Sequence, residues 1–496
     1  MQYIMSGKAC KSLDKYAIEN LEIPSIVLME NAASEIVNKI KDIYDNFIIF
    51  CGSGNNGGDG LAIARKLILL NKRVTVAIIS EKDNYTKDFL VNFKILEKIN
   101  SKIINIKTIK DLSNIYPLKY DVAIDCIFGV GLNRNLKDLY SKVVEFINLN
   151  FKNIISVDVP SGINADTGKV MGTAIKAKTT YTFEVIKKGY ISYSSIDYIG
   201  KLEVLSIGIP KEAKEINSEG VFMLDSIDYK NILNKRKIYS HKGDYGKISI
   251  IAGSEGYTGA AYITAESCVK SGAGLTTVIS SKYVQDILSC KLVEAMTLNI
   301  KEDDKVKKTL ENSNVIAIGP GLTERSYCNI IKEIDNYKNK YYVIDAGALE
   351  VFSKDKELMN IIKDRGIFTP HPGEMARIID KPISFVEENR IEVAKKYAKE
   401  NKIIVLLKGY KTVITDGNFV YINKTGNSKM ASGGMGDCLT GIIASLLGQK
   451  HSPMESALLG AYVHGLAGEE ASKDKYNTIA SDIIDNISKV MENISR

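Results

Sequence analysis

Short apolar runs alternate with amphipathic stretches along most of the 496-residue chain, and this alternation restricts the folds that it can adopt. The run NFIIFC at 46–51 is followed by GGDGLAIARKLILLN at helical spacing and then by RVTVAIIS at 73–80. This order predicts a strand, a helix and a second strand, and strands connected in this way lie parallel in one sheet. The alternation continues through YDVAIDCIFG at 120–129 and NIISVDVP at 153–160. The sequence therefore predicts an α/β fold with a parallel sheet.

A polar segment separates two units of this kind. Residues 216–235 are polar, mixed in charge and weakly periodic, which predicts a connecting segment with one or two short elements. The alternation begins again with GKISIIAGS at 246–254 and ends with two helices. We therefore expect a three-layer α/β domain over residues 1–215 and a second α/β domain over residues 236–496.

Composition excludes several classes of protein. Hydrophobic residues at 45% and charged residues at 25% are typical of a globular chain and rule out disorder. No stretch approaches the roughly 20 apolar residues of a membrane helix, and the N-terminus lacks a signal-peptide pattern, so we expect a cytoplasmic protein with no membrane partner. The net charge of +7 is scattered, which favours a solvated surface over a nucleic-acid partner. Seven cysteines without a CxxC pair, together with four histidines, argue against a zinc ribbon or a His-rich metal site.

The segment from Gly52 to Gly60 reads GSGNNGGDG and lies between a predicted strand and a predicted helix. Glycines allow a ligand to approach the backbone closely, and free N–H groups at a helix N-terminus suit phosphate. The segment matches neither the P-loop nor the GxGxxG pattern. A tight connection alone would explain two of the five glycines but not the packed Asn-Asn-Gly-Gly-Asp, so we expect a binding loop.

Two further polar clusters follow predicted strands. Asp125 precedes the segment FGVGL, and Asp158 begins DVPSG. Ligands of open α/β sheets bind at the carboxyl ends of strands, so these clusters should meet the glycine loop in one crevice. Oxygen atoms of Asn56, Asp125 and Ser161 would favour a hard cation. Taken singly, each aspartate could equally well have only a structural role, in which it caps a helix or orders a loop.

These motifs resemble a known family. GSGNNGGDG, DCIFGVGL, SVDVPSGINADTG and LDKYAIENLEIPSIVLMENAA are similar to the N-terminal, Rossmann-like NAD(P)HX epimerase domain of bifunctional nicotinamide nucleotide hydrate repair enzymes, over residues 10–215. The resemblance implies epimerisation at C6 of the hydrates of NADH and NADPH. We assign the acid/base role to Asp158, because a carboxylate at the reacting carbon is a natural proton carrier. The resemblance implies a potassium ion at Asn56, Asp125 and Ser161. It also implies hydrate contacts at Asn55, Asn56, Gly57, Gly58, Asp59, Gly129, Val130, Gly131, Leu132, Asn133, Arg134, Asn135 and Asp158.

In the second half, the segment TGNSKMASGGMGD places Gly433, Gly434 and Gly436 before Asp437, at the start of an apolar helix. Backbone N–H groups and the positive end of the helix predict an anion pocket. An aspartate there can take a proton from a hydroxyl that is about to receive a phosphoryl group. The alternative is that Asp437 only caps the helix.

Other polar segments also follow predicted strands. LKGYKT supplies Lys408, Gly409 and Thr412, which suit nucleotide phosphates and ribose, although this signal is weak alone. TPHPGEMARI holds His371 between two prolines, so that its ring should project from a loop, and a structural histidine is the alternative. GPGL and GYTGAA add two glycine turns.

Together with KGDYG and MASGGMGD, these segments resemble the ribokinase-like dehydratase domain of the same bifunctional family, over residues 236–490. The resemblance implies dehydration of the S hydrate with magnesium and ADP, giving NAD(P)H, AMP and phosphate. Asp437 would be the base. The implied hydrate contacts are Ala260, Gly321, His371 and Asp437, and the implied AMP or ADP contacts are Lys408, Gly409, Tyr410, Lys411, Thr412 and Gly436.

The chain departs from this family at three places, one of which is Thr323, which follows GPGL where glycine is common. It also reads KGYKT and GNSKMA where the family usually reads KGAGT and GNPGMA. Tyr410 and Lys411 would cover the adenine or add a phosphate contact, a hypothesis that an unchanged ADP Michaelis constant in Lys411→Ala would reject.

Two other functions stay open. An ordinary small-molecule kinase shares the glycine-rich helix start and would release a phosphorylated substrate. A non-catalytic N-terminal module would regulate the second domain. We expect NADHX, NADPHX and ADP as small-molecule partners, potassium and magnesium as cofactors, and a homo-oligomer.

Overall fold

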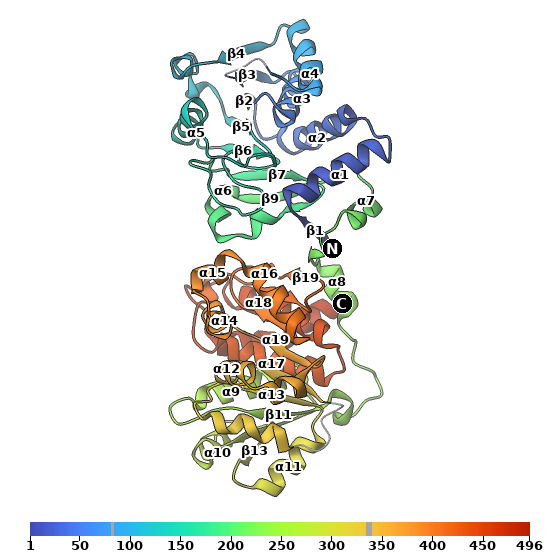
Figure 1. Cartoon of the computed structure of the whole chain (residues 1–496), viewed down its shortest axis with the longest axis vertical. Helices are drawn as coiled ribbons and strands as arrows, with labels where there is room; N and C mark the ends of the chain where they lie inside the picture. The colour runs from blue at the N-terminus through green and yellow to red at the C-terminus, as the bar shows by residue number, and fades with distance from the viewer. Residues whose placement is uncertain (81–83, 334–339) are drawn as a thin grey trace. The chain divides into compact units, whose positions relative to one another are not determined.

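The computed structural model describes residues 1–80, 84–333 and 340–496. The chain forms two compact units, Gln2–Glu219 and Gly220–Arg496, the second of which also includes Met1. Both units combine parallel strands with helices (Figure 1), so the predicted α/β class is confirmed. None of the helices in the described ranges has the length and apolar character that a membrane crossing requires.

The N-terminal unit contains a seven-stranded sheet in which every neighbouring pair is parallel. The strands expected at 46–51, 73–80, 120–129 and 153–160 are adjacent members of it. The order across the sheet is β4 (Lys102–Ile106), β3 (Arg73–Ile79), β2 (Asn46–Cys51), β5 (Val122–Cys126), β6 (Ile154–Val157), β7 (Thr179–Phe183) and β9 (Lys201–Leu205). A separate pair joins β1 (Gln2–Met5) to β8 (Ile186–Lys187) in parallel.

The two faces of this sheet carry different cores because successive strand residues point to opposite faces. Phe47 and Ile49 pack on one face with α2, α3 and α4, and Ile48 and Phe50 pack on the other with α5. The unit therefore has three layers. Its helices are α1 (Gly7–Glu19), α2 (Ser25–Ile40), α3 (Asn55–Leu69), α4 (Lys87–Lys98), α5 (Asp138–Asn150), α6 (Ile196–Ile199) and α7 (Lys211–Ile216), with short 3-10 turns at Ile109–Asn114, Pro117–Lys119, Lys188–Ile191 and Tyr193–Ser195.

The C-terminal unit is built on a longer sheet. Its strands are parallel from β13 to β17, antiparallel through β18 and β19, and parallel again between β19 and β10. The order is β13 (Met296–Asn299), β12 (Leu275–Ser280), β11 (Lys247–Ile251), β14 (Val315–Ile318), β15 (Tyr341–Ile344), β16 (Gly366–Phe368), β17 (Ile404–Leu407), β18 (Val413–Thr415), β19 (Val420–Ile422) and β10 (Val221–Met223).

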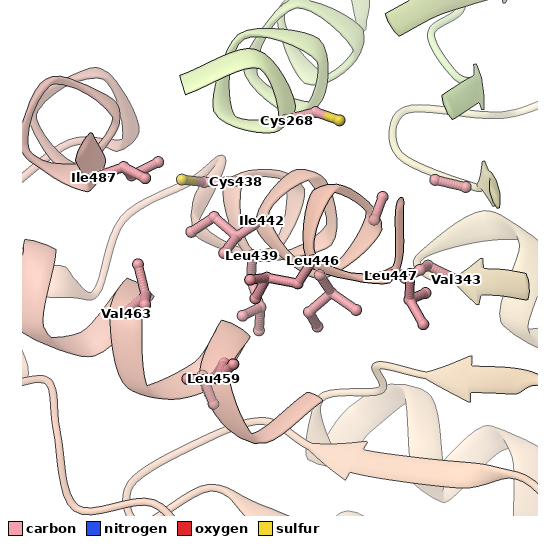
Figure 2. Close-up of a cluster of buried hydrophobic side chains, with 14 of the residues drawn as sticks. Cys268, Val343, Cys438, Leu439, Ile442, Leu446, Leu447, Leu459, Val463 and Ile487 are labelled. Carbon is pink, nitrogen blue, oxygen red and sulfur yellow. The ribbon is translucent and has the colours of Figure 1, made fainter. Parts of the chain in front are cut away.

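The core of this unit surrounds helix α17 (Met435–Gly448). Its side chains pack against α9 on one side and α18 on another (Figure 2), and Ile442 and Leu446 are fully buried. The sequence of α17 has no polar face, and a helix that is apolar on all sides is stable only inside a core. The other helices are α8 (Ser226–Ile232), α9 (Thr258–Lys270), α10 (Lys282–Ser289), α11 (Asp303–Asn312), α12 (Gly347–Lys354), α13 (Lys356–Ile362), α14 (Pro372–Ile379), α15 (Ile383–Glu388), α16 (Arg390–Asn401), α18 (Pro453–Ala471) and α19 (Ala480–Ser495), with 3-10 turns at Lys242–Tyr245, Arg325–Glu333 and Ser428–Met430.

The connection expected at 216–235 contains two short elements, β10 and α8. The two units divide inside this segment, between Glu219 and Gly220. Leu224, Tyr229 and Leu233 belong to the hydrophobic core of the C-terminal unit. Most of the segment is therefore part of that unit and not a free linker, because its few apolar residues are spaced to reach one core.

Candidate active sites

A cavity of about 680 Å³ lies in the N-terminal unit. Its lining includes residues that directly follow β2, β5, β6 and β7, as expected for the carboxyl ends of parallel strands. The structure therefore brings the three polar clusters of the sequence together at one place. The predicted hydrate contacts in the lining are Asn55, Asn56, Asp59, Gly129, Val130, Gly131, Leu132, Asn133, Arg134 and Asp158.

Gly57, Gly58 and Asn135 are predicted contacts that do not line this cavity. A Cβ at Gly57 would overlap the carbonyl oxygen of Gly52, and one at Gly58 would lie 2.6 Å from the methyl carbon of Met29. These two glycines are thus needed for close packing of α3. The start of α3 faces the cavity with Asn55 and Asn56.

Asn56 has a side chain whose polar atoms lack partners. Both its amide oxygen and its amide nitrogen are buried, and no described residue forms a hydrogen bond with either atom. A buried polar group without a partner is costly, so its presence beside a cavity indicates a ligand.

Asp125 and Ser161, the other two predicted potassium ligands, contact each other. The Ser161 hydroxyl donates to Asp125 Oδ1 at 2.6 Å and the Ser161 N–H donates to Oδ2 at 2.8 Å, while Ser156 and the Ile127 N–H also donate to this carboxylate. Burial raises the pKa of Asp125, and these hydrogen bonds oppose that effect. Across the described ranges, no group of three or more His, Cys, Asp or Glu side chains is arranged to hold a metal. The predicted set, of amide, carboxylate and hydroxyl oxygens, is of a different kind and suits a hard cation.

Asp158 forms an ion pair with Lys187, a residue that the sequence analysis did not identify. The Nζ atom lies 2.6 Å from Asp158 Oδ1, and Lys187 is only 3% exposed. Asp158 has a φ of +64°, and its N–H donates to the carbonyl of Tyr181 at 2.7 Å. Its own carbonyl accepts from the Tyr190 hydroxyl. The carboxylate is therefore fixed from both its backbone and its side chain.

Two more carboxyl groups line the cavity near this pair. Burial raises the pKa of Asp14 to about 6, with Lys187 opposing and Asp158 adding to the shift. Burial, with the charges of Asp158 and Asp14, raises the pKa of Asp59 well above its usual value. Asp14 lies on α1 and was also missed, since no strand end or glycine turn marks it in the sequence.

In the C-terminal unit, Asp437 lies in the first turn of α17. Gly434 caps the helix with a φ of +86°, a conformation that favours glycine. Burial raises the pKa of Asp437 to about 6, and the charges of Asp345 and Glu374 add to this while Lys408 opposes it. Among the described residues, no N–H group of its own helix donates to the Asp437 carboxylate, so capping does not account for this aspartate.

Lys408 lies at the centre of a charged network. Its Nζ is 2.8 Å from Asp345 Oδ1 and 3.7 Å from Glu374 Oε2. A Cβ on Gly436 would lie 3.0 Å from the same nitrogen, so the glycine leaves space beside the ammonium group. Asp345 was missed, although an aspartate at the end of YYVID matches the pattern that identified Asp125.

The other predicted residues fall into three groups. His371 caps α14, where its Nδ1 accepts from the N–H groups of Gly373 and Glu374 at 3.0 and 3.3 Å, and burial lowers its pKa. Ala260 and Gly321 are adjacent, since a Cβ on Gly321 would lie 2.8 Å from that of Ala260. The remaining residues form the turn after β17: the Thr412 hydroxyl donates to the Gly409 carbonyl at 3.0 Å, and the Lys411 ammonium group lies 5.1 Å from the centre of the Tyr410 ring.

Comparisons with known proteins agree with this division. Residues 248–489 match the family profile described as NAD(P)H-hydrate dehydratase, and residues 25–189 match that described as YjeF-related protein N-terminus. Two solved structures resemble part of the chain. A ribokinase-like superfamily protein from Enterococcus faecalis is 30% identical with a TM-score of 0.51, covering 56% of this chain and 97% of its own. The protein SMU.573 from Streptococcus mutans is 28% identical with a TM-score of 0.52, covering 55% and 100%.

Curated relatives match over nearly the full length. The bifunctional NAD(P)H-hydrate repair enzyme of Moorella thermoacetica is 36% identical, covering 99% of this chain and 97% of the relative. Enzymes with the same name from Thermofilum pendens and Escherichia coli are 32% and 29% identical, covering 94% and 90% of this chain and 91% and 85% of the relatives. Similarity of this extent across both units shows that the chain belongs to the family of bifunctional NAD(P)H-hydrate repair enzymes.

Proposed function

We propose that the chain repairs NADHX and NADPHX, the hydrated forms of NADH and NADPH, in two steps. The N-terminal unit interconverts the R and S epimers at C6, and the C-terminal unit dehydrates the S epimer with ADP. The observation that carries this proposal is the similarity to bifunctional repair enzymes across both units. Each unit also has a candidate carboxylate of its own: Asp158 lines the cavity of one, and Asp437 lies in the first turn of α17 in the other.

The epimerisation assigned to the N-terminal unit needs a group that exchanges protons. To invert C6, either its bond to oxygen or its bond to the ring nitrogen has to open and close again, and both routes move a proton on and off the hydrate. Asp158 lines the cavity and is the group that we assign to this transfer. The N–H groups at the start of α3 face the same cavity and suit the phosphates of the dinucleotide.

We propose potassium as the cation of the N-terminal unit, because amide, carboxylate and hydroxyl oxygens are ligands that a hard cation takes. We assign its binding to Asn56, Asp125 and Ser161, and the support is the buried amide of Asn56, whose oxygen has no partner among the described residues. A bound cation would supply a fixed positive charge beside the hydrate. The Asp125 carboxylate also ties the loop after β5 to the loop after β6.

The dehydration assigned to the C-terminal unit begins with phosphoryl transfer. Hydroxide is a poor leaving group. Asp437 would take the proton of the C6 hydroxyl as its oxygen attacks the β-phosphorus of ADP, releasing AMP. The ring nitrogen then expels phosphate by breaking the bond from C6 to oxygen, and loss of a proton from C5 restores the double bond. The raised pKa of Asp437 suits a group that must gain and lose protons near neutral pH.

The nucleotide enters this scheme as its magnesium complex, a substrate that brings its own counter-charge. We assign its phosphates to the space beside Lys408 and Gly436, where a cation and the N-terminal end of α17 meet. The turn from Lys408 to Thr412 would hold the rest of the nucleotide, and Ala260, Gly321 and His371 would contact the hydrate. The cytoplasmic location and the homo-oligomer stay predictions from the sequence.

The test is the recovery of reduced-nicotinamide absorbance from a mixture of R and S NADHX with magnesium and ADP. We expect complete recovery of both epimers with ADP and none without nucleotide. Asp437→Asn should abolish recovery, while Asp158→Asn should limit it to the S epimer. A stable phosphorylated product in place of free phosphate would instead identify a small-molecule kinase.

Potassium has its own readout in the same assay. We expect epimerisation to be faster in potassium than in lithium at equal ionic strength, and the difference to disappear in Asn56→Ala. Recovery of both epimers by Asp158→Asn, at the rate of the unmodified chain, would favour a non-catalytic N-terminal module.

A further inference from the structure

We propose that Lys187 is a positioning residue for epimerisation: its ammonium group holds Oδ1 of Asp158, so that Oδ2 is the oxygen that exchanges the proton with the hydrate. This inference rests on the proposed function of the N-terminal unit. It assigns a role to a residue that neither the sequence motifs nor the predicted binding segments include.

Lys187 is a buried cation at the wall of the cavity. Lysine is rarely buried unless its charge is paired, yet Lys187 is 3% exposed and lines the cavity. The other cations of the cavity lining, Lys11 and Arg134, are exposed. Lys187 follows β7 and lies in the short strand β8, where Met5 is its neighbour in β1. Its Nζ also lies 3.3 Å from the carbonyl of Phe183, so the ammonium group is held by the backbone as well as by Asp158.

The two carboxylate oxygens of Asp158 have different surroundings. Oδ1 is 2.6 Å from Lys187 Nζ and 3.5 Å from the Thr182 hydroxyl. Oδ2 receives no hydrogen bond from the described residues, and it points toward Gly129, where a Cβ would lie only 3.0 Å away. Gly129 begins the segment to which the hydrate contacts at 129–135 are assigned. One oxygen is therefore anchored while the other is left open toward that segment.

Acidic side chains surround the pair of Asp158 and Lys187. Asp14 of α1, Asp59 of α3 and Glu184 after β7 also line the cavity, Cys10 of α1 adds a thiol, and Tyr190 is bonded to the Asp158 backbone. Glu184 is occupied elsewhere, since its Oε2 lies 2.7 Å from Lys214. Lys187 is thus the buried cation among several acids, and it offsets the repulsion between Asp158 and its acidic neighbours.

The test compares variants of the full-length chain by the rate at which pure R NADHX becomes S NADHX. Lys187→Met retains bulk and removes the charge, and we expect kcat to fall about 100-fold with KM changed less than threefold, because orientation of the reacting group is lost rather than binding. Lys187→Arg should fall less than Lys187→Met. Lys188→Ala, the adjacent lysine outside the cavity lining, is the matched control and should keep its rate.

Rescue of the epimerisation rate of Lys187→Ala by an added amine would distinguish a positioning role of Lys187 from a purely structural one. Propylammonium matches the atoms that this substitution removes, and we expect it to restore the rate at least tenfold in a saturable manner. It should not restore Lys187→Met, where the side chain fills the space. Thermal melts followed by circular dichroism report whether the N-terminal unit of each variant is folded, and dehydration of S NADHX by the same preparations reports the same for the C-terminal unit.

The outcomes separate the two proposals. No epimerisation by the unmodified chain would overturn the function proposed for the N-terminal unit. Epimerisation by the unmodified chain together with an undiminished kcat in Lys187→Met would overturn the role of Lys187 alone, as would a rate in Lys187→Arg below that of Lys187→Met.

Discussion

Lys408 and Asp345 form a buried ion pair in the C-terminal unit, with Lys408 Nζ 2.8 Å from Asp345 Oδ1. The hydroxyls of Thr369 and Thr440 donate to the two oxygens of the same carboxylate at 2.8 and 2.9 Å. Burial alone would raise the pKa of Asp345, but Lys408 and these hydroxyls outweigh it and hold the pKa below its ordinary value. The carboxylate is therefore fully bonded, which fixes the Lys408 ammonium group next to Gly436.

Lys408→Met should destabilise the C-terminal unit strongly. Removing one partner of a buried pair leaves an uncompensated charge, which costs about 3–5 kcal/mol. Lys396→Met is the control, since Lys396 is exposed and its 3.8 Å pair with Glu400 contributes little. Urea unfolding followed by circular dichroism measures the difference. Equal midpoints for the two variants would show that the C-terminal unit stays stable when the buried Asp345 carboxylate loses its pair with Lys408.

Dehydration should depend on the ionisation of Asp437. A base acts in its deprotonated form, and burial raises the pKa of Asp437 to about 6. We therefore expect kcat/KM for S NADHX to be constant above pH 7 and to fall tenfold for each pH unit below about 6. A pH profile with saturating magnesium and ADP measures this limb. A fall in kcat/KM that begins only near pH 4 would contradict the conclusion that burial raises the pKa of Asp437.

The same carboxylate should cost stability, because its ionised form is disfavoured in the folded state. The folded pKa of about 6 lies above the ordinary value of 3.8, so the cost is complete above pH 6 and is absent below 3.8. Asp437→Asn should therefore raise the stability of the unit at pH 7.5 by about 3 kcal/mol. The difference should shrink as pH falls toward 4, as thermal melts at both pH values would show. An equal gain at both would point to packing instead of charge.

Gly129→Ala should impair epimerisation without unfolding the chain. The new Cβ would lie 3.0 Å from Asp158 Oδ2, a tight contact with the oxygen assigned to proton transfer. Displacement of a reacting group by a few tenths of an ångström lowers the rate, and we expect a loss of about 10- to 100-fold in kcat. Gly131→Ala, whose Cβ would meet no atom within 4 Å, should lose less. The thermal melt of each variant is the control for folding of the N-terminal unit, and its dehydratase rate is the control for the C-terminal unit.

The sequence predicts the parts of each site that lie at strand ends and glycine turns. Asp125, Asp158 and Asp437 could be found because the apolar strand or helix beside them marks where they lie. Asp345 directly follows an apolar strand as well, so the same pattern could have identified it. Lys187 could not be found, because its role comes from Asp158, a partner that only the fold brings within 2.6 Å.

Lys411 combines a backbone conformation that favours glycine with a lowered pKa of its ammonium group. Lys411 has a φ of +51°, a conformation that favours glycine, and burial lowers its pKa to about 8. If its ammonium group contacts a nucleotide phosphate, the KM for ADP should be about five- to tenfold lower in the unmodified chain than in Lys411→Ala at pH 7. The advantage should vanish at pH 9.5, where the amine has lost its proton. Lys411→Gly should match Lys411→Ala in KM but exceed it in stability by about 1 kcal/mol, because only glycine relieves the backbone. A KM for ADP that is equal in all three chains at pH 7 would exclude a contact between the Lys411 ammonium group and a nucleotide phosphate.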